Sequence, residues 1–266
     1  MKIHKLLFGV IMVVSLSANS YSQTTIDSWI DKIKQCDSEE CQKNGLIILK
    51  DSLLRTLGVH DFPSECLCKY VNVNLYDSSL KELLLSNLRS NYDFWTIQIF
   101  FKIGDPIYCD SLVSIYKEKR HSKSLIYDLK MENALIRCGN KDILEQRYKY
   151  LTEAVKHGGT LDLDFCQTIT ETRDVADRRY ADMLMSYVIN NNNQLVYYGD
   201  DGGGNVDYCP LSRLSILILK DIIKDFPYVP QYYELIDEKK ESEIRQWCKK
   251  HQKVYEMNIV SFSLRL

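Results

Sequence analysis

Apolar side chains recur along the middle of the chain at a spacing of 36 residues. Three helical stripes, each with apolar or aromatic residues at positions i, i+4 and i+7, lie one such period apart. A period of this size is typical of stacked helical hairpins, in which each hairpin buries its apolar face against the next. The pattern therefore predicts an all-α fold, an α-α superhelix of antiparallel hairpins. The stripes are Tyr108, Leu112 and Ile115; Leu144, Tyr148 and Leu151; and Tyr180, Leu184 and Tyr187.

Turn residues separate these stripes. Gly104-Asp105-Pro106 supplies a helix-ending glycine, an N-cap and a proline at the first helical position, and Gly139-Asn140 repeats the first two signals. The segment 93–103 alternates like a strand but also carries a helical apolar face. We expect a buried helix there, because its neighbours are helical. The regular part of the pattern covers 92–189.

The N-terminal third is less regular. A helix is expected from Glu40 to Leu57, ending at Gly58, and a second one beginning after Asp77. Between them, His60 to Val73 is expected to be irregular, because Pro63 cannot lie in a helix interior.

A departure from the helical pattern covers 190–210. Four asparagines precede a short β-like run, a glycine-rich turn and a second β-like run. The composition predicts a β-hairpin near 194–209 that projects from the helices. Helices are expected to resume over 211–225 and 241–255.

The repeated hairpins, their Gly-Asp and Gly-Asn turns, and the segment Ile244-Arg-Gln-Trp247 resemble HEAT-like α-helical repeats. The resemblance extends over Tyr92 to Tyr187. The chain departs from that family in its N-terminal third and in the 190–210 insertion. The resemblance implies a curved scaffold with a concave face for a protein or peptide partner.

The first 22 residues have the layout of a secretory signal peptide. Lys2 and Lys5 precede a largely apolar run from Leu6 to Leu16, and small residues follow. That run is shorter than the roughly 20 residues that span a bilayer. Cleavage after Ser22 leaves one expected helical-repeat domain, 23–266, in the periplasm or outside the cell.

The net charge of the chain indicates which classes of partner it is expected to bind. The formal net charge is −2, and loss of the two signal-peptide lysines makes it −4. Nucleic-acid binders carry a basic stripe, which is absent here, so no nucleic-acid partner is expected. No segment after residue 22 is apolar enough for a transmembrane helix.

Nine cysteines follow the signal peptide, and an exported protein is expected to pair some of them. Cys36 and Cys41 form the favoured local disulfide, because five residues can bring two side chains together where a helix ends. The odd number leaves at least one cysteine free or paired between molecules.

The insertion is the predicted binding site, because a loop on a rigid scaffold is where contacts concentrate. Its aspartates and asparagine could supply oxygen ligands to a cation, but their spacing differs from a helix-flanked calcium loop. A turn with positive φ angles is the simpler interpretation. The candidate residues are Tyr197, Tyr198, Asp200, Asp201, Asn205, Asp207 and Tyr208.

Other chemical motifs are weak. His60, Cys66 and Cys68 lack a fourth zinc ligand and the usual cysteine spacing. His157-Gly-Gly-Thr160 resembles an esterase oxyanion loop, but no Gly-x-Ser-x-Gly elbow accompanies it, and a helix end is favoured. No metal, cofactor or catalytic residue is therefore assigned.

The sequence thus predicts an exported helical scaffold that binds a protein or peptide. One alternative is an enzyme, or a small-ligand or cation-binding protein, with its site at 190–210. Another is a protective module that neutralises a toxin.

Overall fold

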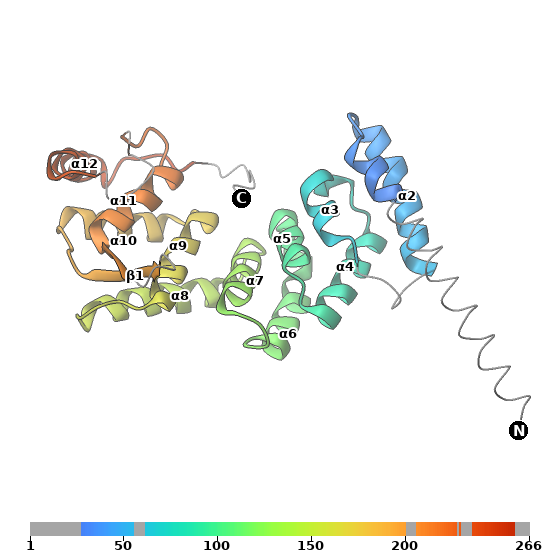
Figure 1. Cartoon of the computed structure of the whole chain (residues 1–266), viewed down its shortest axis with the longest axis horizontal. Helices are drawn as coiled ribbons and strands as arrows, with labels where there is room; N and C mark the ends of the chain where they lie inside the picture. Colours follow the sequence, from blue (N-terminus) through green and yellow to red (C-terminus); the bar gives the residue numbers. More distant parts are fainter. Residues whose placement is uncertain (1–27, 56–61, 201–205, 228, 230–235, 259–266) are drawn as a thin grey trace, which may run out of the picture. The chain divides into compact units, whose positions relative to one another are not determined.

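The computed structural model describes residues 28–55, 62–200, 206–227, 229 and 236–258 (Figure 1). These residues are mostly helical, with one two-stranded antiparallel sheet, which confirms the all-α class with a short β-hairpin. The predicted signal peptide lies outside the described residues. The chain divides into two compact units, with Ile103 the last residue of unit 1 and Gly104 the first of unit 2.

Unit 1 contains a helical segment at 28–34 and four further α-helices. Its core is dominated by leucine, and Leu49, Leu67, Leu84 and Leu88 are fully buried. The remaining elements are α2 (Glu39–Arg55), α3 (Ser64–Tyr70), the 3-10 turn η1 (Val73–Leu75), α4 (Ser78–Asn91) and α5 (Phe94–Ile103).

Helix α3 corrects the expectation of an irregular segment from His60 to Val73. Pro63 lies at the N-cap of α3 and not in its interior. Proline is tolerated at a helix start, because the first N–H groups have no partner within the helix. Leu67, Cys66 and Cys68 on this short helix are buried, so tertiary packing stabilises it.

The ambiguous segment 93–103 forms helix α5, as predicted. Residues Thr96 to Phe101 are all buried, so both the alternating and the helical apolar positions lie in the core. Asp93 accepts hydrogen bonds from the main-chain N–H and the hydroxyl of Thr96, which fixes the start of the helix. Burial on every side explains why sequence periodicity alone could not separate strand from helix.

Unit 2 carries the regular helices and the hairpin. No helix among the described residues is long and apolar enough to cross a membrane. The elements are η2 (Pro106–Tyr108), α6 (Cys109–Lys119), α7 (Leu125–Arg137), α8 (Lys141–Lys156), α9 (Leu163–Val175), α10 (Arg178–Ile189), β1 (Leu195–Asp200), β2 (Val206–Pro210), α11 (Leu211–Ile222) and α12 (Glu238–His251).

Helices of unit 2 pack in two layers. In one layer α9 contacts both α7 and α11, and in the other α10 contacts both α8 and α12. The 36-residue stripes lie on every second helix, α6, α8 and α10, except that Tyr108 lies in η2 just before α6. Residues one period apart touch, because the Tyr180 hydroxyl donates to the main-chain oxygen of Leu144 at 3.4 Å and the Tyr148 and Tyr180 rings are 6.3 Å apart.

Asparagine and aspartate side chains begin most helices of unit 2. Each accepts a hydrogen bond from a main-chain N–H two or three residues ahead, which satisfies a donor that the helix cannot. At the end of α7, Gly139 has a φ angle of 96°, a conformation that favours glycine. The N-cap residues are Asn140, Asp162, Asp177 and Asp237.

A buried polar network crosses unit 2 from α6 to α9. The guanidinium of Arg147, only 2% exposed, donates to Glu132 at 2.7 and 2.9 Å and to the main-chain oxygen of Leu129 at 3.0 Å. It also donates to Asn133, whose amide reaches Glu171 at 2.8 Å. Further contacts come from Tyr116 to Glu132 and from Lys130 to Glu171 and Asp174.

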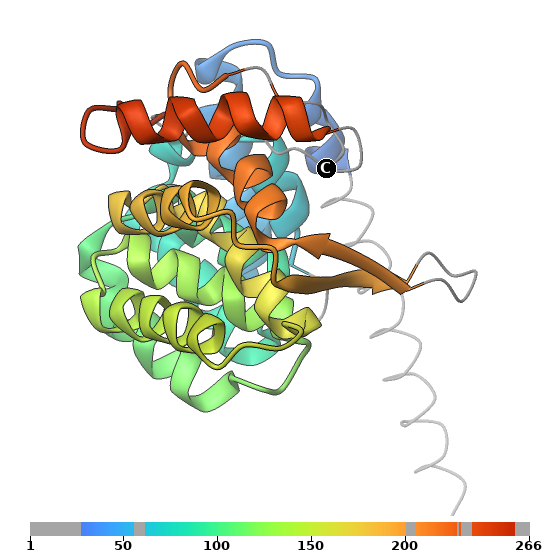
Figure 2. The same ribbon diagram turned by 90° about the vertical axis from the view of Figure 1, so that its left-hand side faces the viewer.

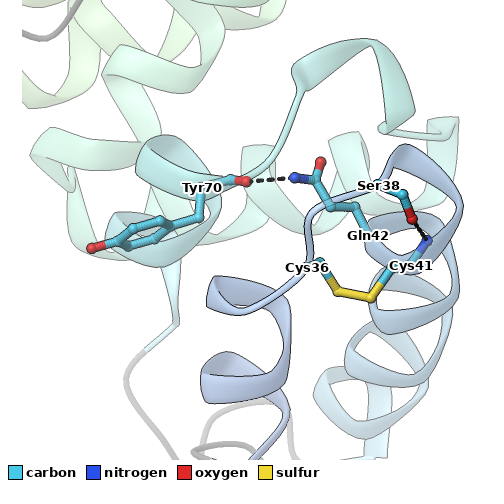
Figure 3. Close-up of a disulfide and its surroundings, with 5 residues drawn as sticks. All are labelled: Cys36, Ser38, Cys41, Gln42 and Tyr70. Atoms are coloured by element: carbon cyan, nitrogen blue, oxygen red, sulfur yellow. Dashed lines mark hydrogen bonds between the residues drawn. A yellow bond between two sulfur atoms is a disulfide. The ribbon is translucent and has the colours of Figure 1, made fainter.

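Cys36 and Cys41 form a disulfide between the segment 28–34 and α2, with their sulfur atoms 2.08 Å apart (Figure 3). Ser38 caps α2 by accepting from the Cys41 main-chain N–H, and Gln42 donates to the main-chain oxygen of Tyr70 at 3.1 Å. The loop closed by this disulfide is short, so its entropic contribution is about 2 kcal/mol. The disulfide therefore fixes a local turn within unit 1.

Candidate functional site

The described parts of the insertion, 190–200 and 206–210, form a hairpin whose base is fixed on unit 2 (Figure 2). Strand β1 pairs antiparallel with β2, and the partners at the base are Leu195 with Pro210, Val196 with Cys209, and Tyr197 with Tyr208. The register shifts between Tyr197 and Gly199, which makes Tyr198 a β-bulge. In Figure 2 the two orange strands extend away from the helices of the unit.

A third chain segment holds the free side of β1. Leu161, between α8 and α9, forms a parallel bridge with Val196. Its N–H donates to the oxygen of Leu195 and its oxygen accepts from the N–H of Tyr197, both at 2.8 Å. The main-chain N–H groups of Leu211 and Ser212 add bonds to Gln194 and Asn192. The hairpin base is therefore held by backbone bonds to two parts of the chain.

The two faces of the hairpin base differ. Val196 and Cys209, both 0% exposed, and Leu161 point into the core of unit 2. The opposite face presents Leu195, Tyr197, Tyr208 and Pro210, which we call the hairpin face. Leu195 and Tyr208 are each 44% exposed, and the Tyr197 and Tyr208 rings lie 5.9 Å apart at 57°. Because these apolar side chains are adjacent, they form a patch of the kind that contacts partners.

The structure describes only part of the predicted site. Tyr197 and Tyr208 are brought together, and Asp207 is exposed on β2. The backbones of Tyr198 and Asp200 belong to β1. Asp201 and Asn205 lie outside the described residues. Within the described parts of the chain, no group of three His, Cys, Asp or Glu residues is placed to hold a metal ion.

Sequence reasoning missed three members of the hairpin region. Leu195 and Pro210 complete the hairpin face, and alternation from Tyr197 and Tyr208 would have identified them once the register was known. Nothing in the sequence around Leu161 indicated that it pairs with β1, because a bridge of one residue has no periodicity. Its neighbours Thr160 and Asp162 are exposed beside the hairpin base.

Four of the buried thiols are poor nucleophiles. Burial raises the pKa of Cys66 and Cys166 to about 11 and that of Cys138 and Cys248 to about 12. A thiol with such a pKa is almost entirely protonated near neutral pH and is a poor nucleophile. These cysteines therefore act as small apolar core residues.

Two shallow hollows lie elsewhere on unit 2. One of about 520 Å³ is bordered by the stacked Trp247 and His251 rings, 4.2 Å apart, and by Tyr255, whose hydroxyl donates to Asp182. A neighbouring hollow of about 330 Å³ lies beside Ser186 and Asn190. Arg178 lies over the Tyr255 ring, so aromatic and charged groups at the first hollow already contact one another.

No protein-family model, curated protein or solved structure matches this chain. Its function is therefore inferred from the chemistry of the hairpin and the helices that hold it.

Proposed function

We propose that this chain is an exported, HEAT-like helical-repeat scaffold that binds another protein or a peptide through the hairpin face. The observation that carries the proposal is an exposed apolar surface on a hairpin whose base is fixed by backbone hydrogen bonds. Leu195 and Tyr208 remain 44% exposed although the neighbouring Val196 and Cys209 are fully buried. Tyrosine contributes strongly to interfaces, since it brings a large apolar area with few rotatable bonds.

The buried polar network of unit 2 is better explained by a structural role than by catalysis. Ionisable groups with shifted pKa values often mark active sites, and burial raises the pKa of Glu171. However, Glu171 contacts Lys130 and Asn133 inside the helical layers, and neither described hollow includes it. The buried network therefore joins helices and does not face a substrate.

Binding at the hairpin face is tested by selecting displayed peptides against the chain 23–266. We expect selected peptides whose affinity falls at least about tenfold when Tyr197 and Tyr208 are both changed to Ser, because burial of two aromatic rings is lost. Kd values measured by isothermal titration calorimetry give the comparison.

The matched control is Tyr70→Ser on α3, because Tyr70 is 46% exposed and belongs to unit 1, whereas the hairpin belongs to unit 2. This variant should bind with unchanged Kd. Failure to select any peptide, or equal binding by the double serine variant, would argue against the proposal. Binding that EDTA abolishes would instead favour the alternative of a cation-binding insertion.

Export is supported by the N-terminal pattern and is compatible with the Cys36–Cys41 disulfide. We expect the protein recovered outside the cytoplasm to begin near Gln23, with one disulfide and seven thiols, because the remaining cysteines are unpaired. Intact mass after unfolding and alkylation, with and without reduction, measures both properties. A chain that retains Met1 and stays in the cytoplasm would contradict export.

A further inference from the structure

The hydrogen-bond pattern of the hairpin shows which backbone groups point outward. The N–H of Leu211 donates to Gln194, so these residues form a hydrogen-bonded pair at the base. Antiparallel pairs alternate between bonded and non-bonded. Val196 and Cys209 are therefore the next bonded pair, whereas Tyr197 and Tyr208 are a non-bonded pair.

The bridge to Leu161 agrees with this assignment. Leu161 bonds to the oxygen of Leu195 and the N–H of Tyr197, which must therefore point away from β2. By the same alternation, the N–H and C=O of Tyr208 point away from β1. Among the described residues, no backbone hydrogen bond outside the hairpin reaches Tyr208. Thus β1 is covered by Leu161, while no backbone group of the described residues is bonded to the outer edge of β2.

An open edge beside an apolar face is suited to an added strand. The edge supplies a donor and an acceptor at Tyr208, and alternate side chains of an added strand would lie beside the hairpin face. Strand β2 itself carries one aspartate and no lysine or arginine. This aspartate, Asp207, is exposed and directly precedes Tyr208.

We propose that the outer edge of β2 binds an extended peptide segment with lysine or arginine next to apolar residues, by strand addition at Tyr208. This inference rests on the proposed function and specifies its binding mode and its class of partner. Main-chain bonds to Tyr208 align the segment, the hairpin face takes its apolar side chains, and Asp207 attracts its basic ones.

The test uses the full chain 23–266 and a peptide selected on it. Tyr208→Pro and Tyr208→Val both remove the ring, but only the proline variant also removes the outward N–H. Proline is tolerated at this type of edge position, because the N–H takes no part in the hairpin ladder. We expect Tyr208→Pro to bind about tenfold more weakly than Tyr208→Val, as one backbone hydrogen bond is lost.

An N-methyl scan of the peptide, measured on the unchanged protein, keeps the test valid if Tyr208→Pro does not fold. One methylated position should abolish binding while its two neighbours do not. Replacing the peptide's basic residues by glutamate should weaken binding, and so should raising the salt concentration.

The failures are distinguishable. Equal Kd values for the proline and valine variants, together with a flat N-methyl scan, overturn strand addition but leave peptide binding at the hairpin face intact. Unchanged binding by the glutamate peptide overturns the basic class of partner. A selected peptide that binds the Tyr197→Ser/Tyr208→Ser double variant with the same Kd as the unchanged protein overturns the proposed function itself.

Discussion

Replacing Arg147 by alanine is expected to lower the free energy of unfolding of unit 2 by about 3–5 kcal/mol. The guanidinium is 2% exposed and donates to Glu132, Asn133 and the main-chain oxygen of Leu129. Its loss leaves a carboxylate and a carbonyl without these donors between α7 and α8. Such groups lose hydration on folding, and the Tyr116 hydroxyl replaces only part of it at Glu132.

Urea denaturation measures this change. Trp29 and Trp95 are replaced by phenylalanine in the background, so that fluorescence of Trp247 in α12 reports on unit 2. The control is Arg179→Ala, which removes ion pairs from a 43% exposed side chain to Glu145 and Asp177, 64% and 28% exposed, and its contact with the Tyr148 ring. An exposed pair contributes about 0–1 kcal/mol, so equal losses for the two variants would refute a structural role for the buried network.

Replacing Leu184 by alanine is expected to lower the stability of unit 2 by about 2–5 kcal/mol. Leu184 is 0% exposed on α10 and belongs to the third of the 36-residue stripes. Removing its side chain loses buried apolar area and leaves a cavity that the packed helices cannot fully close. The same fluorescence-monitored urea denaturation measures the loss.

Ile107→Ala is the control for this substitution, because Ile107 is 76% exposed next to the first stripe. Its effect should stay within about 0.5 kcal/mol. A similar small effect at Leu184 would mean that the stripes do not mark the helical core.

The helices of unit 2 could be predicted because their signals are local. Leu112, Leu144 and Leu184 recur on one helix face and all are buried. Asn140 and Gly139 mark helix ends by the conformations and hydrogen bonds that only a few residue types provide. The stripe pattern placed Tyr108 in a helix, whereas Tyr108 is half-buried and lies on a 3-10 turn before α6.

Features formed between distant segments could not be predicted in this way. From the sequence of its own helix, Arg147 would be predicted to lie on the surface. Its partners lie 14 to 18 residues earlier, on α7, so no local pattern indicates that it is buried. Leu161 bonds to residues more than 30 positions later. Single-residue contacts of this kind leave no period in the sequence, so only the folded chain reveals them.

The candidate site was predicted at the level of its segment. The two β-like runs predicted the strands, and Tyr197 and Tyr208 were named among their aromatic residues. Which side chains share a face depends on register, and the bulge at Tyr198 shifts that register within β1. Leu195 and Pro210 therefore joined the hairpin face only once the pairing was known.

The bridge at Leu161 also determines how the chain would carry mechanical load. Strand β1 is bonded to β2 on one side and to Leu161 on the other. Tension along the hairpin pulls β1 and β2 in the same direction and therefore loads the two hydrogen bonds to Leu161 together, in shear. A partner pulling outward on the hairpin would therefore transmit force to the α8–α9 connection as well as to the connection between α10 and α11.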